Sequence, residues 1–170
     1  MRLALTVSER YEIYGIPVYL GFKGETQEQL RSKISKGLAY LHEYDPRRLA
    51  RAQRDLSGIL VWPRILAGRA TFDPESRMCM LDAESVLGKH AGLVSLSIAH
   101  EAMHARLNRF PYDTPERRAR IERVCVKAEI ALAERVPGGQ RSVASLRAQL
   151  AAIRPESYTE GAWRRRIGRS

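Results

Sequence analysis

The chain has 170 residues, a formal net charge of +10 at pH 7, 28% charged residues and 44% hydrophobic residues. This composition is typical of one globular domain and excludes a disordered chain, and no apolar run approaches the roughly 18 residues of a membrane helix. The opening segment, Met1 to Val7, is too short for the apolar core of a signal peptide, and two cysteines exclude a disulfide framework. We therefore expect a cytoplasmic protein with no membrane partner.

The first half of the chain predicts short strands mixed with two helices. A run rich in Ile, Val and Tyr that is broken by Gly15 and Pro17 predicts two strands around a turn in Tyr11–Phe22, and an apolar run closed by Pro63 predicts a strand at Gly58–Trp62. The turn sequence Pro-Glu-Ser at residues 74–76 predicts a hairpin with arms Arg69–Asp73 and Arg77–Asp82. Leucine and isoleucine at helical spacing predict helices over Thr26–His42 and, after the N-cap pair Asp45-Pro46, over Arg47–Leu56.

After Gly88 the pattern becomes helical. It predicts a helix that ends near Asn108, a long helix from Thr114 to about Val136, and a last helix over about Ser142–Ile153. Strands and helices followed by helices alone are typical of the α+β class. We expect one domain over residues 1–154 and a loosely ordered basic tail over residues 155–170.

One motif in the second half carries chemistry. Residues 100 to 104 read His-Glu-Ala-Met-His, which is H-E-x-x-H on a predicted helix. Positions i and i+4 of a helix lie one above the other, so the imidazoles of His100 and His104 can hold one metal ion. Glu101 is adjacent to the first histidine and can reach a water molecule at that metal. The pattern therefore predicts a zinc site.

These three residues resemble the H-E-x-x-H motif of the zincin metallopeptidases. The resemblance implies a zincin-like α+β fold, with a small N-terminal sheet and helices followed by the motif helix and a Glu-bearing helix. Catalytic zinc usually has three protein ligands and an open position for water. The metzincin extension is excluded because Leu107 and Phe110 stand where that branch has Gly and His.

A downstream carboxylate is then expected as the third ligand, as in the gluzincins. Glu122 is favoured, because a reversal of the chain at Arg109–Asp113 would place the first two turns of the next helix beside the histidines. Glu129, seven residues on and on the same face, is the alternative ligand or a partner that orients a histidine ring. Cys125 could also approach the site, although a buried packing role is favoured for it and for Cys79.

The resemblance implies hydrolysis of peptide bonds in a peptide or protein substrate. Zinc would polarise a water molecule, and Glu101 would accept its proton and pass it to the leaving amine. Tyr112, Tyr158 and His90 are candidate donors for the oxyanion. In zincins the strand before the motif helix is often a sheet edge that pairs with substrate. By position that strand is Arg77–Asp82, with an interior strand as the alternative.

Two other functions remain open. The first is a catalytically silent zincin-like module that regulates or binds a partner, in which a fourth protein ligand would close the metal site. The second is a nucleic-acid-binding protein, which the charge of +10 permits but no recognised binding motif supports. We favour a peptide substrate over nucleic acid, and the sequence does not predict the oligomeric state.

Overall fold

The computed structural model describes residues 8–63, 70–108 and 114–159. The strands are β1 (Glu9–Ile13), β2 (Ile16–Leu20), β3 (Gly58–Trp62), β4 (Ala70–Asp73) and β5 (Met78–Asp82). The helices are α2 (Glu25–Tyr44), α3 (Pro46–Asp55), α4 (Ala83–Gly88), α5 (Ala91–Leu107), α6 (Pro115–Ala133), α7 (Gln140–Ala152) and the 3-10 turn η1 (Pro155–Tyr158). The chain thus has the expected α+β class, with a small mixed sheet and several helices.

The strands form one sheet in the order β1-β2-β3-β5-β4. A tight turn at Tyr14 and Gly15, both with positive φ, joins β1 to the antiparallel β2. β3 runs parallel to β2 and to β5, so the connection from β2 to β3 must cross over, and α2 and α3 form that crossover. β4 pairs antiparallel with β5 and ends the sheet.

The expectation that the strand at Arg77–Asp82 is a sheet edge is wrong. β5 pairs with β3 on one side and β4 on the other, so it is an interior strand. Its residues explain this position, because Met78, Cys79 and Leu81 are buried and pack as a central strand does. The edge on this side is β4, all four residues of which are partly exposed.

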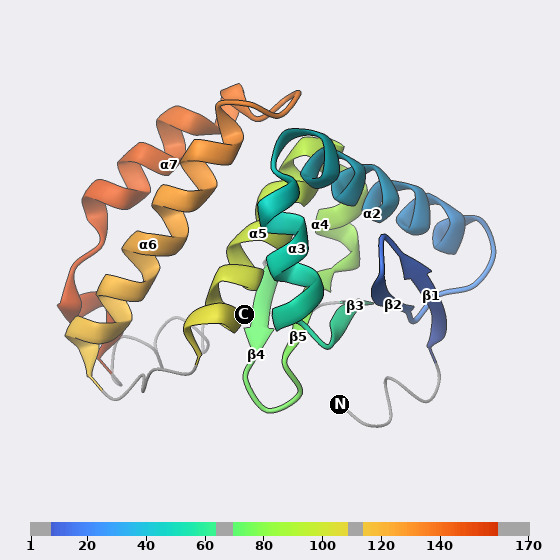
Figure 1. The fold of residues 1–170 in the computed structure, drawn as a ribbon, viewed down its shortest axis with the longest axis horizontal. Coiled ribbons are helices and arrows are strands. Elements are labelled where there is room, and N and C mark those ends of the chain that lie inside the picture. The colour runs from blue at the N-terminus through green and yellow to red at the C-terminus, as the bar shows by residue number, and fades with distance from the viewer. Residues whose placement is uncertain (1–7, 64–69, 109–113, 160–170) are drawn as a thin grey trace.

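The motif helix α5 is the centre of the fold. It packs against α2, α3 and α6 and against strands β4 and β5 (Figure 1). Leu96 and Ile98 are buried in the main core beside the apolar face of α2, which contributes Leu30, Ile34 and Leu38. A helix enclosed on most sides is held rigidly, so side chains that project from it are well positioned.

Helices α6 and α7 form a hairpin beside α5 (Figure 1). The turn of this hairpin lies against the start of α5, where a Cβ atom added to Gly92 would lie 2.1 Å from the carbonyl oxygen of Pro137. Arg48 of α3 donates to the carbonyl of Ala128 in α6, and Arg135 donates to Asp45 over 2.6 Å. These contacts fix α6 relative to α3 and the hairpin turn relative to α5.

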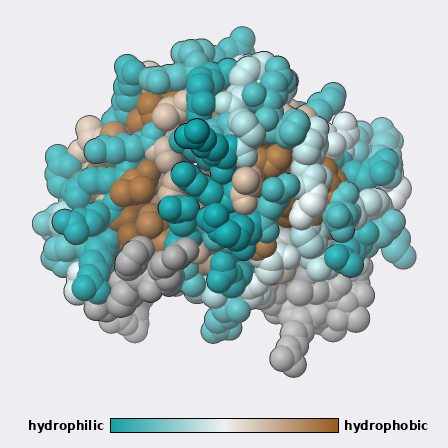
Figure 2. Space-filling model, viewed as in Figure 1, coloured by the Kyte–Doolittle hydropathy of each residue, from teal (hydrophilic) through white to brown (hydrophobic). Residues whose placement is uncertain are grey.

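The expected C-terminal tail is ordered at its beginning. Residues Pro155–Tyr158 form η1, which packs against α6 through partly buried Tyr158. The arginines at 164–166 lie outside the described residues. The viewed face of the described chain is mostly hydrophilic, and its apolar residues appear as small separate patches (Figure 2). Among the described helices, none combines the length and apolar character needed to cross a bilayer.

Candidate metal centre

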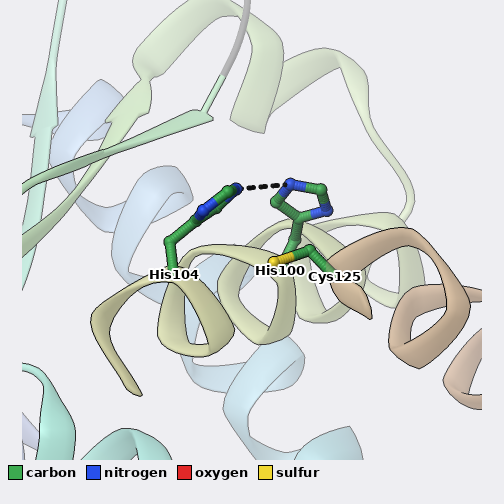
Figure 3. Close-up of side chains that lie close together, drawn as sticks. All are labelled: His100, His104 and Cys125. Carbon is green, nitrogen blue, oxygen red and sulfur yellow. Dashed lines mark hydrogen bonds between the residues drawn. The ribbon is translucent and has the colours of Figure 1, made fainter. Parts of the chain in front are cut away.

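The two histidines of the motif project from the same side of α5. They are one helical turn apart, and their Nε2 atoms face each other at 3.1 Å (Figure 3). Both atoms are acceptors in the neutral ring when Nδ1 carries the proton. Two facing nitrogens cannot both be bare acceptors, so one ring carries a proton on Nε2 and donates it to the other, or both lone pairs point to a metal ion.

Glu122 brings a carboxylate to the same point from α6. Its Oε2 lies 3.3 Å from Nε2 of His104 and its Oε1 lies 3.6 Å from Nε2 of His100. Thr114 caps the N-terminus of α6 by accepting from the backbone N–H of Arg117, and Glu122 follows about two turns later. The structure therefore brings together the three residues that the sequence favoured as ligands.

Glu129 contacts the other nitrogen of His100. Nδ1 of His100 donates to Oε2 of Glu129 over 2.9 Å. A carboxylate at Nδ1 fixes the tautomer that leaves the Nε2 lone pair free, which is the arrangement usual for metal-bound histidine. Of the two roles left open for Glu129, this geometry fits the orienting partner.

The two histidine nitrogens and the Glu122 carboxylate lie at separations that fit a zinc ion. Tetrahedral zinc with bonds of about 2.0–2.1 Å sets neighbouring ligand atoms about 3.3 Å apart. The observed separations among the two Nε2 atoms and the Glu122 oxygens are 3.1, 3.3 and 3.6 Å. Nitrogen and carboxylate oxygen are also the donor atoms of catalytic zinc sites.

The electrostatics of the site favour a cation. The side chains of His100, His104, Glu122 and Glu129 are only 12–19% exposed. Burial alone would lower the pKa of His100, but hydrogen bonds to Glu122 and Glu129 outweigh it and raise this pKa well above its usual range. Burial would raise the pKa of Glu122, but its contacts with the two histidines hold it well below the usual range. Both shifts indicate that the site stabilises positive charge.

Glu101, the expected base, is buried at 6% exposure on the inner side of α5. Burial raises its pKa, while the charges of His100 and His104 oppose the rise. A carboxylate whose pKa lies above the usual range is a better proton acceptor. The pKa of Cys79 in β5 is raised by burial and, to a smaller extent, by the charge of Glu101, so the Glu101 side of α5 faces the sheet.

The three candidate oxyanion donors have different positions. His90 accepts from the backbone N–H of Gly92 and caps α5, ten residues and about 15 Å along the helix axis from His100. The structure therefore does not bring His90 to the histidine pair. Tyr158 packs beside α6 in η1. Tyr112 lies outside the described residues.

Sequence reasoning missed a cation close to the site. Nζ of Lys89 lies 3.5 Å from Oγ of Ser97, which is one turn before His100 on α5. Burial lowers the pKa of Lys89, while the negative charges of Glu129 and Asp82 oppose the change. The two residues line a small hollow beside Ala70, the first residue of the edge strand β4. Lys89 belongs to no short sequence motif, and only the folded chain brings it close to Ser97.

In comparisons with known proteins, no family model, curated protein or solved structure matches this chain. Functional assignment therefore depends on the site itself.

Proposed function

We propose that this chain is a zinc-dependent metallopeptidase with a zincin-like, gluzincin-type centre. The observation that carries the proposal is the convergence of Nε2 of His100, Nε2 of His104 and the carboxylate of Glu122 from two helices. The distances suit zinc, and the donor set leaves a position open for water. Glu129 supports the centre by orienting His100.

The residues around the centre suit hydrolysis of a carbonyl compound. Zinc, when bound, supplies a Lewis acid that lowers the pKa of water towards neutrality. Glu101 accepts the proton of the attacking water, a role for which its burial and raised pKa suit it. Glu101 then passes this proton to the leaving amine, which must be protonated before the bond to carbon breaks.

A peptide is the favoured substrate because of the edge strand. β4 ends the sheet on the side where α5 packs, and both β4 and β5 contact α5. An extended peptide can add to such an edge through main-chain hydrogen bonds, which would lay it along the motif helix. The substrate-pairing role expected for the strand at Arg77–Asp82 thus passes to Ala70–Asp73.

The experiment is a cleavage screen on protein loaded with one equivalent of zinc. The protein is incubated with a proteome-derived peptide library, and new termini are identified by mass spectrometry. We expect cleavage by the unaltered protein and none above background by Glu101→Gln at equal zinc content. Equal cleavage by both proteins would exclude the proposed reaction.

A catalytically silent zincin-like module is the second candidate, and one observation favours it. Cys125 is buried close to both histidines, and a fourth protein ligand would fill the position that water needs. Binding of nucleic acid rests on net charge alone and is not favoured.

A further inference from the structure

Cys125 lies on the face of α6 that meets the histidine pair. It is three residues after Glu122 and four before Glu129, so the three side chains form one stripe along the helix. The residue is fully buried. Its sulfur and one nitrogen each of His100 and His104 all lie within 4.8 Å of one another (Figure 3).

A sulfur atom at this distance is close to coordination. Thiolate binds zinc at about 2.3 Å, which in a tetrahedral site sets sulfur about 3.6 Å from each histidine nitrogen. Because the sulfur lies within 4.8 Å of both nitrogens, a shift of at most roughly 1 Å would reach that distance. Cys125 thus belongs with His100 and His104 to a group of side chains whose ligand atoms lie close enough together to hold a metal ion.

We propose that Cys125 is a fourth protein ligand of the same metal ion and gives the centre a closed form. The proposal rests on the zinc centre described above. As the metal–sulfur bond forms, the Cys125 thiol releases its proton to solvent and the water molecule leaves the fourth position. When the sulfur leaves, it takes up a proton and a water molecule returns, so the two forms differ by one proton and one water molecule.

The other cysteine provides a matched control. Cys79 is equally buried, and burial raises the pKa of its thiol, with a smaller contribution from the nearby charge of Glu101. It comes from β5, however, and is not a member of the group that Cys125 forms with the histidines. Replacement of either cysteine by alanine removes one buried sulfur atom. Only Cys125→Ala should change the set of atoms that coordinate the metal.

The test uses cobalt(II) in place of zinc, because thiolate ligation gives cobalt an intense near-ultraviolet charge-transfer band. The full chain and the variants Cys125→Ala, Cys125→Ser and Cys79→Ala are loaded with one equivalent of cobalt. Bound metal is measured by elemental analysis and folding by circular dichroism. We expect the band in the unaltered protein and in Cys79→Ala, and its complete loss in both Cys125 variants at equal cobalt content.

The alternative results overturn the proposal in distinguishable ways. One bound cobalt without the band would exclude the Cys125 ligand and leave the open centre intact. A band that survives in a folded Cys125 variant would exclude it as well. Failure of every protein to bind cobalt would exclude both the ligand and the metal centre. A Cys125-dependent band in a protein that cleaves no peptide would support the ligand and reject the peptidase function.

Discussion

Nδ1 of His100 donates to Oε2 of Glu129 over 2.9 Å, and its Nε2 faces His104 at 3.1 Å. Each nitrogen of this ring therefore has a separate task. One contact sets the tautomer and the tilt of the ring, and the other presents a lone pair to the centre. The two glutamates of α6 also have separate roles. Glu122 contacts the Nε2 atoms of both histidines, whereas Glu129 contacts only Nδ1 of His100.

This division predicts the order of zinc affinities in two variants. Glu129→Ala should lower the affinity for zinc by about 10–100-fold. Glu122→Ala removes a proposed ligand and should lower this affinity further. Competition with a chromophoric chelator measures both. Glu134→Ala, which removes an exposed carboxylate at the C-cap of α6 that pairs with Arg147, is the control and should bind zinc normally. A larger loss in Glu129→Ala than in Glu122→Ala would reverse our assignment of the two roles.

Replacement of the base should separate binding from catalysis. Glu101→Gln keeps the shape of the buried side chain but removes the proton acceptor, so zinc affinity should persist while kcat falls at least about 100-fold. Zinc content and turnover of a mapped peptide are measured on the same preparation. Turnover within twofold of the unaltered protein would remove Glu101 from the mechanism.

Zinc should stabilise the fold, because the ligands that we propose for it come from two helices. Free zinc at about 1,000 times Kd adds about 4 kcal/mol to the free energy of unfolding. In a chain of this size that corresponds to a rise in Tm of about 8–16 °C. Calorimetry with zinc and with excess chelator gives this difference. His104→Ala should abolish the zinc-dependent rise, and a full rise in that variant would place the metal elsewhere.

Asp45 should contribute more as a helix cap than as an ion-pair partner. It caps α3 by accepting from the N–H of Arg48, and it also pairs with the half-exposed Arg135. Asp45→Ala should lower the free energy of unfolding by about 1 kcal/mol or more, whereas Asp45→Asn keeps a good cap and should cost less. Urea titration compares the two, and equal losses would assign the effect to charge.

The contact between Gly92 and the hairpin turn predicts opposite effects at two glycines. Gly92→Ala places a Cβ atom 2.1 Å from the backbone oxygen of Pro137 and should destabilise the fold by about 1–3 kcal/mol. Gly88→Ala in α4 meets no atom within 4 Å and should be neutral or stabilising by up to about 1 kcal/mol. Thermal unfolding distinguishes them, and a stable Gly92→Ala would mean that the hairpin moves away easily.

The sequence predicted the elements well where a local signal marks them. The strand at Gly58–Trp62 has the expected bounds, and the cap residues Asp45 and Thr114 both begin helices. Helix α4 was missed because six residues are too few to show a helical period, although Asp82 caps it. The order of the strands was also missed, because the sequence of a hairpin does not show which of its two strands pairs with a third strand.

The candidate site was also predictable where local signals mark it and not where tertiary packing decides it. An i, i+4 histidine pair is set by one helix, and a Glu on the facing helix follows once the two helices run antiparallel. The separate roles of Glu122 and Glu129 required the register of α6 against α5, which Arg48 and Gly92 help to set through contacts remote in sequence. The position of Lys89 beside Ser97 depends in the same way on tertiary packing.

The division of the ligands between two helices has a consequence for assembly. His100 and His104 come together as soon as α5 forms, but Glu122 arrives only when the α6–α7 hairpin docks. A metal ion held by the histidines alone would be bound weakly, and docking would tighten it. In the proposed centre the affinity for zinc would therefore measure how well the hairpin is docked, and a partner that pulls the hairpin aside would release the metal without touching a ligand.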